Sequence, residues 1–306
     1  MPISVTELFR YPVKSCRGER LTRAAVEPWG LAGDRRFMLV DDDGNAVTAR
    51  DRPRLLLVNA VIAGNHLRLS APGIEPLTVP VPVPVRPRGT AQARPARQPS
   101  DANEPWQDHQ PEMIAVRIWR SKLDAALAAP TAHAWFSAVA GVSVRLVYLD
   151  DPTRRAMDPA HSRPSDRVSF ADGYPLLLAS ESSLAAVDAW IATGPHAEEG
   201  PVPMRRFRPS VVVAGAPAWA EDGWRRIRVG ETFFRVARSC DRCVMTRLDP
   251  DTARMGHEPM SSLARHRRWD DKLWFAVNLI PEGPGALAIG DEVQIIDSGP
   301  AFEPLR

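Results

Sequence analysis

The chain has 306 residues, 44% of them hydrophobic and 25% charged, with a formal net charge of +2, a composition typical of a soluble globular enzyme of one or two domains. The small net charge gives no reason to expect nucleic acid as a partner, and no apolar run approaches the roughly 20 residues that a bilayer span needs. Residues 1–10 lack the features of a secretion signal, and three cysteines are too few for a disulfide framework, so we expect a cytoplasmic bacterial protein with no membrane partner.

The first seventy residues carry the alternation and turn signals of β-structure. Asp41-Asp42-Asp43-Gly44-Asn45 separates two apolar runs, which is a hairpin signal, and Gly64-Asn65 marks another turn. The predicted strands are residues 3–9, 36–40, 46–49, 54–58 and 66–70.

The composition changes over residues 80–111. Valine alternates with proline up to Val85, and the residues that follow are polar with almost no bulky aliphatic side chains. Such a segment has little apolar surface to bury, so we expect a proline-rich, solvated loop. An ordered insertion stays open as the alternative.

The middle of the chain returns to regular structure. Trp135, Phe136 and Val139 recur at helical spacing and predict a helix over residues 125–140, which Gly141 ends. A strand over residues 144–148 and an irregular crossing loop over 150–167 follow.

A second compact region begins near Val168. Residues 175–179 predict a buried strand, and Ser180 is the expected N-cap of a helix whose apolar side includes Val187 and Trp190. The later predicted strands are residues 210–213, 226–229, 232–236, 274–279 and 292–296. Many short strands, few helices and no fixed repeat predict a mainly β (α+β) fold, a barrel or a sandwich.

Two of the three cysteines, Cys240 and Cys243, lie three positions apart with Arg242 between them. A structural zinc site needs four ligands, and the seven histidines form no pair at helical or finger spacing. A thioredoxin-like dithiol usually opens a helix, whereas residues 244–248 predict a strand. Two inert, buried cysteines remain possible.

The remaining interpretation is that one thiolate binds a soft metal. A lone protein sulfur cannot hold a metal tightly, so an organic cofactor would complete the coordination. A phosphorylated cofactor needs cations, hydroxyls and backbone N–H groups. Residues 11–18 and 33–37, rich in lysine, arginine, serine and glycine, are candidate anion-binding loops, although surface lysines near turns are usually just solvated.

Together these segments resemble the MOSC superfamily, the proteins similar to the C-terminal part of molybdenum cofactor sulfurase. The resemblance extends over nearly the whole chain and is greatest to the amidoxime-reducing and YcbX-like members. The motifs that carry it are Tyr11–Cys16, Thr48–Arg50, Pro53–Leu55, Phe207–Ser210, Ala220–Trp224, Ser239–Thr252, Phe275–Asn278 and Gly290–Val293. It implies a MOSC β-barrel core preceded by an N-terminal β-barrel-like domain, with a few helices.

The domains implied by the resemblance are residues 1–125, the N-terminal β-barrel domain with the loop over 80–111, and residues 166–300, the MOSC domain. Residues 126–165 would connect them through a helix, a strand and a crossing loop.

The resemblance also implies a molybdenum cofactor, a molybdopterin whose metal accepts one protein thiolate; pyridoxal phosphate is not expected. By motif position that catalytic ligand is Cys243. The cofactor-binding residues implied by the motifs are Lys14, Ser15, Arg35, Arg36, Ser180, Ser182 and Arg208. An ordinary helix cap explains the two serines equally well.

The activity implied is reduction of N-hydroxylated compounds such as amidoximes, hydroxylamines and N-hydroxy purine bases. Relatives with a ferredoxin domain carry clustered cysteines that this chain lacks, so we expect electrons from a separate ferredoxin-like, cytochrome or flavin protein. Ala253 also stands where a glycine commonly follows the threonine. A cofactor carrier or sulfur-handling protein without turnover, and a cofactor-free binding protein, are the alternatives.

Overall fold

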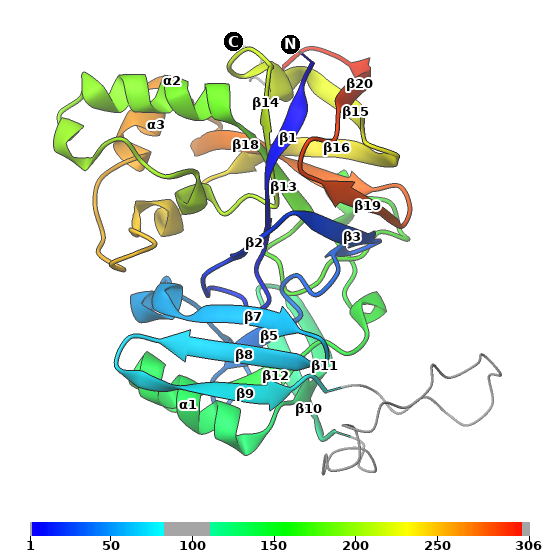
Figure 1. Cartoon of the computed structure of the whole chain (residues 1–306), viewed down its shortest axis with the longest axis vertical. Helices are drawn as coiled ribbons and strands as arrows, with labels where there is room; N and C mark the ends of the chain where they lie inside the picture. The colour runs from blue at the N-terminus through cyan, green and yellow to red at the C-terminus, as the bar shows by residue number, and fades with distance from the viewer. Residues whose placement is uncertain (1, 83–110, 302–306) are drawn as a thin grey trace.

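The computed structural model describes residues 2–82 and 111–301, and strands dominate both of its halves (Figure 1). The mainly β fold predicted from the sequence is confirmed. Most of the predicted proline-rich loop over residues 80–111 lies outside the described residues. In the described ranges, no helix combines the length and the apolar content that crossing a membrane requires.

The half drawn in the lower part of Figure 1 contains two antiparallel sheets covered by helix α1 (Pro130–Ala140). The five-stranded sheet has the order β10 (Met113–Ile118), β11 (Ser121–Leu127), β12 (Arg145–Tyr148), β5 (Phe37–Val40) and β6 (Ala46–Val47). The three-stranded sheet consists of β7 (Asn59–Ala63), β8 (His66–Ala71) and β9 (Ile74–Pro80).

Strand β5 joins two hydrophobic cores because successive side chains of a strand point to opposite faces. Phe37 and Leu39 pack into the core under α1, together with Phe136. Met38 and Val40 pack into the core on the other face. All four strand residues are buried, which fixes the position of the loop that precedes them.

The other half is built on a nine-stranded sheet whose strands β13 and β14 are parallel, with helices α2 (Glu181–Ala192) and α3 (Met260–His266) beside it (Figure 1). The strand order is β2 (Glu19–Leu21), β1 (Ser4–Arg10), β14 (Val211–Ala214), β13 (Leu176–Ser180), β18 (Lys272–Pro281), β16 (Thr232–Asp241), β15 (Trp224–Val229) and β20 (Val293–Ser298), and β17 (Arg268–Trp269) pairs with β18. A small sheet of β19 (Gly285–Ala288), β3 (Arg23–Glu27) and β4 (Gly30–Leu31) adjoins it.

The first strand of the chain belongs to this second half. β1 pairs with β14, and its Val5 and Leu8 are buried in the same core as Val211 and Val213. After β1 the chain descends past the junction between the halves, and it returns there before β13. Segments from both halves are thereby brought together at the junction.

In the first 140 residues, two predicted elements differ in the structure. Residues 54–58 were expected to form a strand, but Pro53–Leu57 form a 3₁₀ helix with Pro53 at its first position, where a missing N–H costs nothing. The predicted helix over 125–140 begins only at Pro130, because residues 125–127 belong to β11. Short apolar runs fit a strand or a buried helical turn equally well, and periodicity does not separate them. Gly141 ends the helix in the left-handed conformation, as expected.

Candidate functional site

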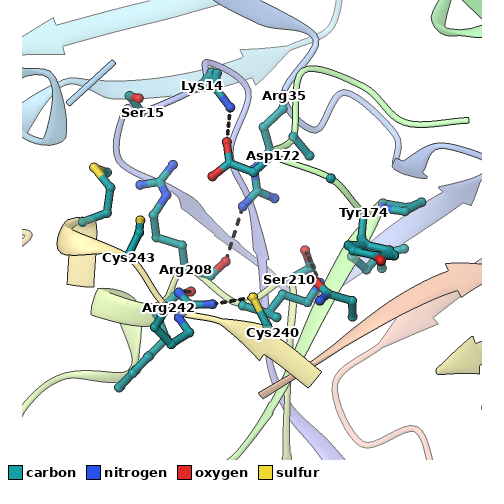
Figure 2. A pocket seen from close by; sticks show the side chains of 18 of the residues that line it. Lys14, Ser15, Arg35, Asp172, Tyr174, Arg208, Ser210, Cys240, Arg242 and Cys243 are labelled. Carbon is teal, nitrogen blue, oxygen red and sulfur yellow. Dashed lines mark hydrogen bonds and ion pairs between the residues drawn. The ribbon is translucent and has the colours of Figure 1, made fainter. Parts of the chain in front are cut away.

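A cleft lies at the junction of the two halves and is lined by residues of both (Figure 2). Segments after β1 and before β5 contribute from one side, and segments around β13, β14 and the end of β16 contribute from the other. Its charged lining is dominated by cations, with Asp172 as the one carboxylate among the described lining residues. The cations are Lys14, Arg35, Arg50, Arg206, Arg208 and Arg242.

The two cysteines reach the cleft because β16 ends between them. The pairing of β16 with β18 shifts register between Ser239 and Asp241, around Cys240. Cys243 then precedes a 3₁₀ helix over Val244–Arg247, and its carbonyl accepts bonds from the N–H and hydroxyl of Thr246 at 3.1 and 3.0 Å. The strand predicted over residues 244–248 is therefore wrong, because local bonds of the threonine favour a turn.

Each thiol of the pair faces an arginine. Nη1 of Arg242 donates to Sγ of Cys240 at 3.0 Å, and Nη2 of Arg50 donates to Sγ of Cys243 at 3.3 Å. Burial raises the pKa of Cys240, although Arg242 opposes this. Both cysteines are half-buried and line the cleft, so neither is sealed in a core. Within residues 2–82 and 111–301, no third His, Cys, Asp or Glu completes a compact metal-binding group with them.

Lys14, Asp172 and Arg50 form a charged network on the wall of the cleft. Nζ of Lys14 pairs with Asp172 and donates to the carbonyl of Phe170 at 2.9 Å, and Arg50 donates to Asp172 at 3.1 Å. Burial lowers the pKa of Lys14 to about 8 despite the nearby carboxylate. The enclosure of Asp172 would raise its pKa, but Lys14 and Arg50 outweigh this and hold it below its usual range. Its side chain is still 59% exposed, because the cleft is open to solvent.

Three lining residues adopt a left-handed backbone that side chains other than glycine disfavour. The φ angles are 70° at Ser15, 46° at Arg35 and 56° at Arg208. A non-glycine residue in this region costs about 1–2 kcal/mol, and such strain gathers at functional sites. At Arg35 and Arg208 this cost is offset by side-chain contacts, namely the ion pair of Arg35 with Asp34 and the hydrogen bond from Arg208 to the carbonyl of Cys16 at 2.8 Å.

The ring of Tyr11 makes cation–π contacts with two of these arginines. The guanidinium groups of Arg35 and Arg208 lie 4.1 and 4.3 Å from the centre of its ring, and its hydroxyl donates to the carbonyl of Pro209 at 3.1 Å. Arg35 also pairs with Asp34 at 2.6 Å. The contacts orient the guanidinium groups before any ligand is present, which lowers the entropy lost on binding an anion.

Comparison with known proteins identifies the two halves of the chain. The model of the MOSC N-terminal beta barrel domain matches residues 3–143, and the model of the MOSC domain matches residues 165–294. The chain belongs to the MOSC family. The N-terminal match contains Lys14, Ser15 and Arg35, and the MOSC match contains Arg208 and Cys243, so both MOSC modules line the cleft.

Similar proteins include amidoxime-reducing components. The chain is 28% identical to mitochondrial amidoxime-reducing component 1 of Homo sapiens over 96% of this chain and 83% of that protein, and 28% identical to its namesake in Xenopus laevis over 94% and 81%. Among solved structures, the YUAD protein from Bacillus subtilis aligns over 96% of this chain and 94% of its own at 12% identity, with a TM-score of 0.39.

The cleft gathers five of the site residues predicted from the sequence, Lys14, Ser15, Arg35, Arg208 and Cys243 (Figure 2). The other three do not line it.

Those three have other surroundings. Arg36 is buried and donates to the carbonyls of Leu149 and Asp150 at 2.7 and 3.0 Å. Ser180 occupies the expected N-cap position of α2, but its buried hydroxyl caps no N–H group and has no bonding partner. Ser182 lies in the first turn of α2, half-buried.

Three further residues of the MOSC cleft, Arg50, Asp172 and Arg242, were not among the predicted site residues. Arg50 and Arg242 each lie in a motif that the sequence displays, but nothing there shows that they bind the thiols. Asp172 carries no signal of its own, since its partners Lys14 and Arg50 are 158 and 122 positions away. Only the fold brings these charges together.

Proposed function

We propose that this MOSC protein reduces N-hydroxylated compounds, such as amidoximes, hydroxylamines and N-hydroxy purine bases, with a molybdenum cofactor bound in the cleft. The observation that carries the proposal is the Cys243 thiol, which lies against Arg50 in a cleft lined by six cations. The names of the relatives support the same reaction class, since they are amidoxime-reducing components.

The donor set of the cleft fits such a cofactor. Thiolates are soft ligands that suit redox-active transition metals, and arginines bind phosphate through charge-assisted hydrogen bonds. Cys243 would provide the bond to the metal, and Lys14, Ser15, Arg35 and Arg208 would hold the anionic part of the cofactor. Because Arg36, Ser180 and Ser182 do not line the cleft, we leave them out of this set.

The residues of the chain orient the reaction, and the cofactor, when bound, supplies the two-electron chemistry. The overall reaction consumes two electrons and two protons, converts the N–OH group to N–H and releases one water. Arg50 donates to the Cys243 sulfur and so fixes the position of the side chain that would hold the metal. Asp172, ionised between Lys14 and Arg50, keeps both cations in place on the wall of the cleft.

The electrons would come from a separate ferredoxin-like, cytochrome or flavin protein. An iron–sulfur cluster normally takes four cysteine ligands, and this chain has three cysteines. One of them, Cys16, is fully buried, and burial raises its pKa to about 12. All three are free thiols. We propose that the protein is cytoplasmic, a compartment in which thiols stay reduced.

The test uses protein made in a host that synthesises molybdopterin. The native protein should contain about one molybdenum per chain and reduce benzamidoxime to benzamidine with a reduced viologen dye as electron donor. Cys243→Ser should lose at least about 100-fold in activity, because the ligand is gone, and Cys240→Ser, which removes the neighbouring thiol, should lose less.

Molybdenum content and thermal unfolding are measured on the same samples. Full activity in folded Cys243→Ser would overturn the ligand assignment. Native protein that binds molybdenum but reduces no N-hydroxylated compound would be a carrier, and native protein free of molybdenum would refute the cofactor itself.

A further inference from the structure

Three metal-ligating side chains meet on the second half of the molecule, outside the cleft. His196 and Glu199 lie in the segment after α2, around a 3₁₀ helix over Ala197–Glu199, and His257 lies in the loop before α3. One potential ligand atom from each lies within 4.8 Å of the others. Across the described ranges, no other group of His, Cys, Asp and Glu side chains is this compact.

The sequence did not reveal this group. The two histidines lie at neither helical nor finger spacing but far apart in the chain, and only the fold brings them together. Two neutral imidazoles and one carboxylate form a ligand set that zinc uses when a fourth position is left to water.

We propose that His196, Glu199 and His257 bind a Zn²⁺ ion whose remaining coordination is water. Zinc bonds of about 2.0–2.1 Å place tetrahedral ligand atoms about 3.4 Å apart, so ligand atoms that lie within 4.8 Å of one another need to approach by up to about 1.4 Å. The two histidine side chains can make this movement, because His196 is only half-buried and His257 is exposed.

The carboxylate of Glu199 is already fixed for this role. Its oxygens accept bonds from the backbone N–H of His257 at 3.0 and 2.8 Å and from that of Glu258 at 2.9 Å. Gly256 makes room for it, because a Cβ there would collide with Oε2 of Glu199. Outer hydrogen bonds that orient a ligand in this way are a regular feature of metal sites.

The two imidazoles lie together before any metal arrives. Their ring centres are 4.1 Å apart and their planes differ by 8°. This places ring nitrogens, the atoms through which an imidazole binds a metal, side by side. Glu198 adds a second negative charge, with its Oε1 3.9 Å from Nδ1 of His196.

The ion would join two segments that line the catalytic cleft. The segment with His196 continues to Phe207 and Arg208, and the segment with His257 follows Cys243. Arg206 already links them by donating to the carbonyls of Arg247 and Glu258 at 3.0 and 3.1 Å. Zinc at the surface would be a second link between these segments, and the site is independent of which reaction the cleft catalyses.

The experiment measures Zn²⁺ binding by calorimetry, with Co²⁺ absorption as a spectroscopic probe, on the full chain after treatment with a chelator. All measurements use a Cys240→Ser/Cys243→Ser background, so that the thiols of the cleft cannot bind the metal. We expect one Zn²⁺ per chain and, at a free concentration 100 times Kd, a rise in Tm of about 5 °C. His257→Ala should weaken binding at least about tenfold, and Glu199→Gln and His196→Ala should do the same.

The matched control is His161→Ala, which removes an exposed histidine outside the group and should leave the affinity unchanged. Tm without metal is compared for every variant, and His257→Ala is decisive because its side chain is exposed and its loss should not affect folding. Absence of Zn²⁺ binding in the background protein, or an affinity that His257→Ala leaves unchanged, would overturn the proposal.

Discussion

Lys14 is the cation of the cleft whose charge depends on pH in the physiological range. Burial lowers its pKa to about 8, and the attraction of Asp172 offsets only part of this shift. Below that pH the side chain is a cation, and above it the side chain is neutral. Arginine at the same place would keep its charge throughout, because its pKa exceeds 12.

We therefore expect the affinity of the cofactor-free cleft for sulfate to fall about tenfold as the pH rises from 7 to 9, since one charge-assisted contact is lost. Sulfate does not titrate in this range, so the protein alone would cause the change. Calorimetry at low ionic strength measures it, and Lys14→Arg should keep its affinity over the same range. A parallel decline in both proteins would show that Lys14 is not responsible.

At the scale of single residues, the sequence indicated those site residues that lie in recognisable motifs. Cys243, Lys14 and Arg208 are of this kind, and all three line the cleft. The same reasoning could not identify Asp172 as a site residue, because only the fold places the cations Lys14 and Arg50 beside this carboxylate. Ser180, in contrast, was correctly predicted as the N-cap of α2, but its side chain does not line the cleft.

At the scale of elements, the apolar pattern predicted secondary structure correctly where a segment packs into a core, and incorrectly where local hydrogen bonds form a turn. The four buried residues of β5 and the helix ended by Gly141 follow from apolar spacing and a stop signal. The segment after Cys243 begins with apolar and β-branched residues, but the bonds of Thr246 to the Cys243 carbonyl form a helical turn. Such bonds depend on where β16 ends, which the sequence alone does not determine.

Tyr11, directly after β1, connects this strand to the segment that precedes β14. Its buried hydroxyl donates to the carbonyl of Pro209, and its ring supports Arg35 and Arg208. Tyr11→Phe keeps the ring and leaves that carbonyl unpaired, so it should lower the free energy of unfolding by about 1–2 kcal/mol while sulfate affinity stays unchanged.

Tyr11→Leu removes the ring as well and should weaken sulfate binding several-fold, because two guanidinium groups lose their support. Chemical denaturation and calorimetry on the same preparations separate the two effects. Equal sulfate affinities in the leucine and phenylalanine variants would show that the ring does not organise the cleft.

At the scale of the whole molecule, the two family modules share a sheet and a hydrophobic core. β1 and β2 extend the sheet of the MOSC half, and β3 pairs with β19. The core of that half contains Val5, Leu8, Val26 and Leu31 from the first part of the chain. The sequence predicts two successive modules, because pairing between strands that are far apart in the chain leaves no local sequence pattern.

We expect a chain of residues 165–300 alone to fail to fold. It would lack four large apolar core residues, each contributing about 1.5–3 kcal/mol by burial, a sum comparable to the whole stability of about 5–15 kcal/mol. It would also expose the edges of β14 and β19, which invites aggregation. Size-exclusion chromatography and thermal unfolding of the fragment test this, and co-expression with residues 1–164 should restore a soluble complex. A monomeric fragment that unfolds cooperatively by itself would show that β1 is dispensable to the second half.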